Sequence, residues 1–171
     1  MDKITRALHA GWQHFLQGLH GEDHQKLLES LREEYVEEAR DVAQFTQHAG
    51  RMYYPQLWER LLRIAAEERA HVEWLREKIL ALGGDIPSLL SMPKSGKNSW
   101  ECLLMDLDEE KRSCEALLER MHTAEPIDPE IAEGLRRMRE EEKRHRHEIL
   151  DMLTKSDPYA LPRGRTAGGV T

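Results

Sequence analysis

The sequence predicts an all-α protein, folded as an antiparallel four-helix bundle with one long crossover between the second and third helices. Charged residues make up 33% of the 171 residues and aromatic residues only 6%. This balance is typical of helices that each bury one narrow apolar stripe. Apolar residues recur at alternating steps of three and four along four long segments, and Gly and Pro residues separate those segments.

The four predicted helices cover residues 23–50, 56–82, 98–123 and 128–154. The predicted stripes of the first two are Leu28, Leu31, Tyr35, Glu38, Val42, Phe45 and Ala49, then Trp58, Leu62, Ala65, Glu68, Val72, Leu75, Ile79 and Leu82. Those of the last two are Trp100, Leu103, Leu107, Glu110, Cys114, Leu117 and Met121, then Ile131, Leu135, Met138, Glu142, His145, Ile149 and Met152. Every stripe therefore contains a glutamate.

The connections between these segments indicate how the helices are joined. Gly50 and Pro55 mark a short first turn, and Asp128 before Pro129 is typical of an N-cap followed by a first-turn proline. Residues 84–97 are too many for a hairpin turn. At about 3.3 Å per residue they could extend roughly 45 Å, the length of one helix. This predicts a crossover that returns the chain to the opposite end of the bundle.

The regions outside the bundle are predicted to be accessory. Residues 1–21 form an N-terminal amphipathic extension that we expect to pack on the bundle or on a neighbouring subunit. Its apolar residues are Ile4, Leu8, Trp12, Phe15, Leu16 and Leu19. Residues 22–155 form the bundle domain. Residues 156–171 are rich in Gly and Pro and are expected to be a flexible C-terminal tail.

Composition also excludes several classes of function. The net charge of −7 argues against nucleic-acid binding. No apolar run approaches 18 residues and no signal-peptide pattern is present, so we expect no membrane insertion and a cytoplasmic location.

Cys102 and Cys114 would lie about 18 Å apart along one helix, too far to pair. We further expect a homo-oligomer, such as a dimer.

The glutamates in the stripes indicate a metal site, because a carboxylate in an apolar seam requires a proton, a partner or a cation. Each acid falls near the middle of its helix, so all four share one layer of the bundle. Two of them are followed three residues later by a histidine, which lies on the same helix face. The candidate ligands are Glu38, Glu68, His71, Glu110, Glu142 and His145.

Several neighbouring acids compete for these positions. Glu119 and His122 have the same spacing but lie at the end of a helix and off its stripe, so we interpret them as surface residues. Other acids could replace or accompany the chosen ones: Glu34 and Glu37 compete with Glu38, Glu109 competes with Glu110, and Glu67 and Glu141 precede the two acids that are paired with histidine. The alternative to a metal site is a buried network of acids paired with His or Arg.

Four carboxylates and two imidazoles form a hard, mixed oxygen and nitrogen ligand set, which suits iron or manganese, with zinc able to bind adventitiously. Four negative charges balance two divalent cations. In this hypothesis Glu68 and Glu142 bridge the two ions. Glu38 and His71 cap one ion, and Glu110 and His145 cap the other.

The order Glu, Glu-x-x-His, Glu, Glu-x-x-His over residues 23–154 resembles the ferritin-like superfamily, especially its rubrerythrin and bacterioferritin branch. The resemblance implies that the six residues bind two iron ions and react with dioxygen or peroxide, as a ferroxidase or a peroxidase-like oxidoreductase. Two departures from rubrerythrins occur: the rubredoxin domain is absent, and their additional glutamate would fall at Leu107. The ligand set is closer to that of bacterioferritin.

Two further features complete the prediction. Tyr35 lies one turn before Glu38 and could supply a proton or an electron, although packing is the more common role of such a tyrosine. Basic residues at 136, 139, 143 and 146 are interleaved with acids and predict a solvated, salt-bridged face. A metal-free scaffold or interaction protein is the alternative function, and a manganese catalase or a hydroxylase of similar fold is a further one.

Overall fold

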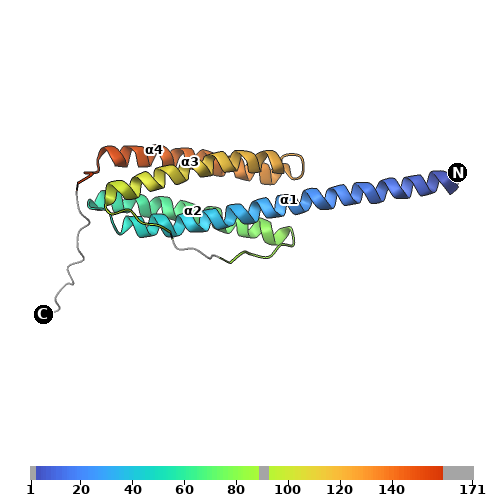
Figure 1. Cartoon of the computed structure of the whole chain (residues 1–171), viewed down its shortest axis with the longest axis horizontal. Helices are drawn as coiled ribbons and strands as arrows, with labels where there is room; N and C mark the ends of the chain where they lie inside the picture. Colours follow the sequence, from blue (N-terminus) through green and yellow to red (C-terminus); the bar gives the residue numbers. More distant parts are fainter. Residues whose placement is uncertain (1–2, 89–92, 160–171) are drawn as a thin grey trace.

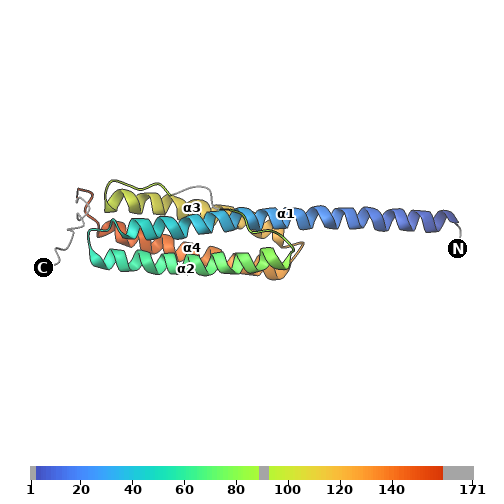
Figure 2. The ribbon, with the colours of Figure 1, turned by 90° about the horizontal axis from the view of Figure 1, so that it is seen from below.

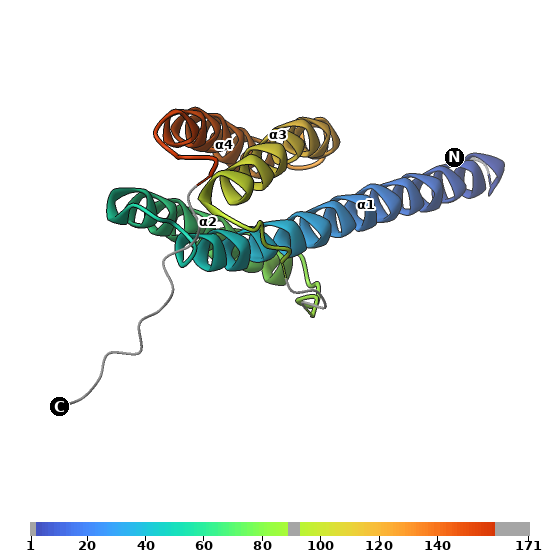
Figure 3. The same cartoon turned by 60° about the vertical axis from the view of Figure 1, so that its left-hand side comes forward.

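A computed structural model describes residues 3–88 and 93–159, with side chains from residue 21 onward. It consists of α1 (Lys3–Ala49), α2 (Pro55–Ala81), α3 (Ser99–Ala124) and α4 (Pro129–Thr154), and the described residues contain no strand. The helices α1 and α4 run in one direction, and α2 and α3 run in the other (Figure 1). The pair α1–α2 and the pair α3–α4 form two layers (Figure 3). The predicted all-α four-helix bundle is therefore confirmed.

The helix ends agree with the predicted ends to within one residue, except at the start of α1. Local caps explain this agreement. The Asp128 side chain accepts hydrogen bonds from the backbone N–H groups of Glu130 and Ile131, at 3.0 and 3.1 Å. The Asn98 side chain accepts one from the Glu101 N–H at 2.9 Å. Such caps satisfy N–H groups that have no partner within the helix, so they define where a helix begins.

The start of α1 differs from the prediction, which began the first bundle helix at residue 23. The helix is continuous from Lys3 and projects beyond the other three (Figure 1). No proline interrupts this segment, and each of its three glycines, Gly11, Gly18 and Gly21, lowers helix stability by only about 1 kcal/mol. The division into an extension, a bundle domain and a tail stays a prediction, and residues 160–171 of the tail lie outside the described part of the chain.

The connection from α2 to α3 begins at one end of the bundle and reaches α3 at the other (Figure 2). A buried histidine attaches it to the bundle. His48 Nε2 lies 2.9 Å from the Lys94 carbonyl oxygen, and Nδ1 lies 2.6 Å from Asp106 Oδ1. Although burial opposes the charged form, the hydrogen bond to Asp106 raises the pKa of His48 to about 10. The ion pair with Asp106 joins α1 to α3, and the contact with Lys94 joins α1 to the crossover. The sequence did not predict either contact.

The apolar core is divided into two clusters, one at each end of the bundle. The first consists of Leu27, Leu28, Leu31, Leu75, Ile79, Leu117, Ala124, Ile131, Ala132, Leu135 and Met138. The second consists of Phe45, Ala49, Met52, Leu57, Leu61, Ile64, Ala65, Cys102, Leu103, Ile149 and Met152. The four stripe glutamates lie along the helices between these clusters. Both cysteines are buried and free, as their predicted separation requires.

One stripe prediction was wrong. Trp58 was expected in the core, but it is 44% exposed, whereas Leu57 and Leu61 are fully buried. The apolar pairs at 57–58 and 61–62 fit two stripes that differ by one residue, so periodicity did not distinguish them. The observed buried face of α2 continues from Leu61 through Glu68 and His71.

A close contact between α2 and α4 predicts the effect of a mutation. A Cβ atom at Gly134 would lie 2.0 Å from Cζ2 of Trp74. We expect Gly134→Ala to lower the free energy of unfolding by about 1–3 kcal/mol, because the indole ring must move, despite about 1 kcal/mol of added helix propensity. Urea unfolding measures this change. Gly21→Ala is the control, since no atom lies within 4 Å of its added Cβ, and it should be neutral or stabilising. A stabilised Gly134→Ala variant would contradict the expectation.

Candidate metal centre

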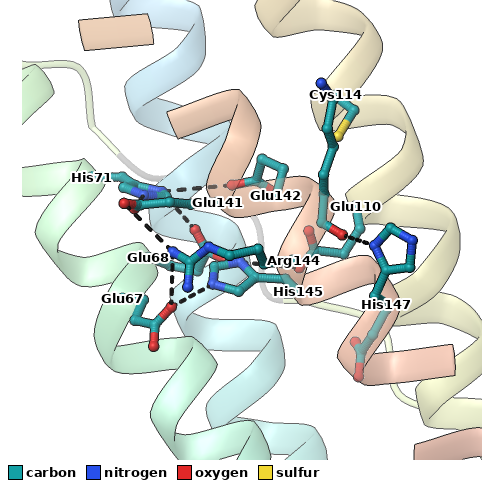
Figure 4. A network of polar contacts seen from close by, with 12 residues as sticks. Glu67, Glu68, His71, Glu110, Cys114, Glu141, Glu142, Arg144, His145 and His147 are labelled. Atoms are coloured by element: carbon teal, nitrogen blue, oxygen red, sulfur yellow. Dashed lines mark hydrogen bonds and ion pairs between the residues drawn. The ribbon is translucent and has the colours of Figure 1, made fainter. Parts of the chain in front are cut away.

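The six predicted ligands come together in one buried layer between the two apolar clusters. Glu38 comes from α1, Glu110 from α3, and one Glu and one His from each of α2 and α4. Each of the six residues is at most 4% exposed. Figure 4 shows Glu68, His71, Glu110, Glu142 and His145 converging from their helices. The mid-helix positions noted in the sequence thus place all six side chains at one height.

Their ligand atoms form two overlapping groups. In each group the atoms lie within 4.8 Å of one another, close enough to surround one ion. The first group is Glu38, Glu68, His71 and Glu142, and the second is Glu68, Glu110, Glu142 and His145. Glu68 and Glu142 belong to both groups. The sequence led us to expect the same division. Glu68 and Glu142 are shared, Glu38 and His71 belong to one group, and Glu110 and His145 belong to the other.

The inner nitrogen of each imidazole points toward the carboxylates. His71 Nδ1 lies 2.9 Å from Glu68 Oε2, 3.2 Å from Glu38 Oε2 and 3.6 Å from Glu142 Oε1. His145 Nδ1 lies 2.7 Å from Glu68 Oε1 and 3.7 Å from Glu110 Oε1. Both imidazoles therefore contact Glu68, while His71 also faces Glu38 and Glu142 and His145 also faces Glu110.

The outer nitrogen of each imidazole contacts an acid on the opposite helix. His71 Nε2 lies 2.7 Å from Glu141 Oε2, and His145 Nε2 lies 2.8 Å from Glu67 Oε2. A carboxylate accepts hydrogen bonds, so each Nε2 carries the proton in these contacts, and Nδ1 of a neutral imidazole keeps its lone pair. Arg144 lies between the two acids, 3.9 Å from Glu67 and 3.5 Å from Glu141 (Figure 4).

These outer acids were considered in the sequence only as competing ligands. The signal for their role was the repeat itself, because both histidines are preceded by two adjacent glutamates, in EERAH at 67–71 and EEKRH at 141–145. The sequence could not show that each outer acid binds the histidine of the other helix. That pairing depends on how α2 and α4 lie against each other.

The carboxyl groups of the layer are buried close together, and this opposes their ionisation. Burial, followed by repulsion from neighbouring carboxylates, raises the pKa of Glu38 and Glu110 well above the ordinary range. The same causes raise the pKa of Glu142 to about 7. Glu68 differs: burial raises its pKa, but the two adjacent imidazoles outweigh burial and the net pKa is lowered. The layer therefore favours positive charge, whether protons or cations.

Unpaired polar atoms show that a cation suits this donor set. Among the described side chains, both carboxylate oxygens of Glu110 and Oε1 of Glu142 are buried without a hydrogen bond. Buried polar atoms without partners cost free energy. Carboxylate oxygens and imidazole nitrogens are suitable ligands for a divalent ion of the iron or manganese type, which would displace the protons that these groups hold.

The competing acids lie outside these two groups of ligand atoms. Glu34 is buried, and its Oε2 lies 2.8 Å from Arg120 Nε. Glu37 Oε2 accepts a hydrogen bond from the same arginine at 3.2 Å. Glu109 forms ion pairs with Arg40, at 2.6 Å, and with Arg112. The geometry thus favours Glu38 and Glu110 over their neighbours.

The remaining expectations concern residues outside the layer. Glu119 and His122 are exposed, as expected for a surface pair. Tyr35 is half-buried and packs against the first apolar cluster, which accounts for its place in the stripe. Arg136 pairs with Glu125 and Glu133, in agreement with a salt-bridged face on α4. Among the described residues, no helix has the length and apolar character needed to cross a membrane.

Comparison with solved structures establishes the class of fold as the ferritin-like four-helix bundle. A ferritin-like, diiron-carboxylate protein from Bacillus anthracis superimposes with a TM-score of 0.72 at 23% identity, covering 77% of this chain and 97% of that one. The bacterioferritin of Desulfovibrio desulfuricans, whose structure describes a diiron site, gives a TM-score of 0.73 at 23% identity, covering 79% and 82%. No family model and no curated protein matches the sequence.

Proposed function

We propose that this protein is a di-iron carboxylate protein that reacts with dioxygen or peroxide, as a ferroxidase or a peroxidase-like enzyme. One observation carries the proposal: two buried groups of ligand atoms share Glu68 and Glu142. In the proposal Glu68 and Glu142 would be shared by the two ions, Glu38 and His71 would hold one of them, and Glu110 and His145 would hold the other. The solved structures of similar fold, described as diiron proteins, agree with this proposal.

Charge and ligand type favour iron, with manganese as the second choice. Four carboxylates neutralise two divalent cations, and two neutral imidazoles complete a hard oxygen and nitrogen set. Two ferrous ions held in this layer would supply one electron each to a bound oxidant.

The protein's own residues provide the surroundings for this chemistry. Glu67 and Glu141 hold the imidazoles with Nδ1 directed inward. Apolar clusters lie on both sides of the layer along the bundle axis and keep bulk water from it. Within the layer, Glu142 has a pKa of about 7 and can exchange a proton for a cation near neutral pH. Tyr35 remains a candidate electron or proton donor.

The function is tested by loading the protein with ferrous iron under anaerobic conditions. We expect two iron ions per chain by metal analysis, and a rise in near-ultraviolet absorbance when oxygen or peroxide is added. Comparing the rates with the two oxidants separates a ferroxidase from a peroxidase-like enzyme. A chain that binds no iron and whose stability is unchanged by iron would instead be a metal-free scaffold or interaction protein. The cytoplasmic location and the homo-oligomeric state also remain predictions.

A mutation at Glu141 tests how the imidazoles are oriented. We expect Glu141→Ala to weaken metal binding about 10- to 100-fold while the stoichiometry stays at two, because His71 loses the acceptor that orients it. Calorimetric titration with Co²⁺ measures both quantities. Glu140→Ala is the matched control, since Glu140 is exposed and pairs only with Lys143 among the described contacts. Equal affinities for the two variants would contradict this role.

A further inference from the structure

Three acids near the proposed ligands form ion pairs with arginines of the facing helix. Glu34 and Glu37 lie on α1, and Arg120 of α3 pairs with both. Glu109 lies on α3, and Arg40 of α1 pairs with it. Both halves of the bundle therefore show the same arrangement, in which an acid beside a proposed ligand is paired with a guanidinium from across the α1–α3 interface.

Glu34 is the one of these acids that is best placed to act as a ligand. It lies one turn before Glu38 on the same face of α1, and neither residue is more than 1% exposed. On a helix, the Cβ atoms of residues four positions apart are only about 5–6 Å apart. A glutamate side chain is long and flexible, so a carboxylate at position 34 can reach toward the place that Glu38 occupies.

The Arg120 guanidinium holds Glu34 in another direction. Its Nε lies 2.8 Å from Glu34 Oε2 and donates a hydrogen bond to the Ser30 carbonyl oxygen at 3.2 Å. Its Nη2 donates to Glu37 Oε2 at 3.2 Å. Arg120 is only 8% exposed, and its planar group directs several donors at fixed angles. The contacts therefore fix the Glu34 carboxylate against α3.

This ion pair bears on the charge of the metal centre. The four ligand carboxylates balance two divalent cations, and a fifth carboxylate in the layer would change the ligand set. A buried carboxylate without a cationic partner is costly, so it requires a proton or a cation. With Arg120 as its partner, Glu34 needs neither from the centre.

We propose that Arg120 determines which acid of α1 serves as a metal ligand, because it holds Glu34 in an ion pair and leaves the ion beside His71 to Glu38. Arg120 is a positioning residue, since it acts through Glu34 and touches no ion. The inference rests on the proposed function, because it assumes a centre that binds cations. It predicts that Glu34 takes the place of Glu38 when both Arg120 and Glu38 are absent.

A rescue of metal binding in the full chain tests this role. Glu38→Ala removes one ligand and leaves room for another side chain, so we expect it to bind one Co²⁺ ion in a spectroscopic titration at micromolar concentration. Adding Arg120→Gln frees Glu34, and we expect the second ion to be restored. Adding Glu34→Gln to this double variant should return the count to one. Misfolding cannot produce such a gain.

Two controls make the rescue specific. In the matched control, Arg40→Gln takes the place of Arg120→Gln, and one ion should stay bound, because Arg40 pairs with Glu109, which Arg112 also holds. Glu34→Gln in the otherwise unchanged chain should bind two ions with wild-type affinity, because Glu34 is not a ligand while Arg120 holds it.

Loss of Arg120 leaves a buried acid without its partner, so circular dichroism should follow the folding of each variant. If the double variant unfolds without metal, Co²⁺ should refold it, because an ion then takes the place of the guanidinium beside Glu34.

Four results overturn the role of Arg120 and leave the metal centre standing. They are two ions in Glu38→Ala alone, one ion in the double variant, two ions in the triple variant, and a double variant that Co²⁺ cannot fold. A wild-type chain that binds no Co²⁺ overturns the proposed function and this inference together.

Discussion

Replacing Glu68 by Gln is expected to abolish binding of both metal ions, whereas replacing Glu38 by Gln is expected to abolish binding of only one. Glu68 belongs to both groups of ligand atoms, and Glu38 belongs to one. Loss of a shared carboxylate removes a negative charge from both positions. We expect affinity to fall at least about 100-fold at each, or about 2.7 kcal/mol. Spectroscopic titration with micromolar Co²⁺ should give two ions for wild type, one for Glu38→Gln and none for Glu68→Gln.

The chain contains its own control for this series. Glu119 also precedes a histidine by three residues, but the pair is exposed at the end of α3. Glu119→Gln should therefore bind two ions with wild-type affinity. One ion retained by Glu68→Gln, or both lost in Glu38→Gln, would show that the two positions do not share ligands in the proposed way.

The metal-free protein is expected to lose stability as the pH rises from about 6.5 to 10. Burial disfavours charged imidazoles, but nearby carboxylates outweigh it and raise the pKa of His71 and His145 to about 9. His48 is raised to about 10. The folded state then binds protons that the unfolded state has released, so this contribution is complete below pH 6.5 and is lost through pH 9–10.

The carboxylates reinforce this direction near neutral pH. Glu142 has a folded pKa of about 7, and the pKa of Glu38 is also raised, so above about pH 4.5 the folded state holds protons that the unfolded state has released, and stability falls as the pH rises. Glu68 acts in the opposite direction, because its lowered pKa contributes stability that is present above about pH 4.5 and is lost as the pH falls. Because the groups are coupled, their individual shifts do not add, and we expect a total loss of several kcal/mol between pH 6.5 and 10, on the order of a few pKa units at about 1.4 kcal/mol each.

Metal should reverse this pH dependence. Protons compete with cations for the imidazole nitrogens and the carboxylates, so metal binding strengthens as the pH rises. Binding to the folded state adds about 2.7 kcal/mol when free metal exceeds the dissociation constant 100-fold. Urea unfolding from pH 6 to 8 should show falling stability with a chelator and rising stability with Co²⁺. Parallel curves in the two conditions would contradict the proposed ligands.

Much of the fold was predictable from local patterns. Helix ends followed from turn and cap residues such as Pro55 and Asp128, and the Asp128 side chain accepts hydrogen bonds from neighbouring N–H groups. The six candidate ligands followed from spacing, because a helix places residues three or four apart on one face. Where two apolar residues were adjacent, as at Leu57 and Trp58, spacing alone chose the wrong one.

Contacts between helices were not predictable in this way. The pairing of Glu141 with His71, of Glu67 with His145, and of His48 with Asp106 joins residues 58–78 positions apart in the chain. For Asp106 nothing local distinguishes this acid from the many others in the sequence. For Glu67 and Glu141 the repeat marked the acids, but not the histidine that each one contacts.

By itself, the sequence determined four helices and most of the side chains that each turns toward the bundle interior, because helical geometry depends only on nearby residues. The tertiary structure decided which acids meet which histidines and which of two adjacent apolar residues on α2 is buried. Those outcomes depend on the distance and rotation between packed helices, and packing of the whole core sets both.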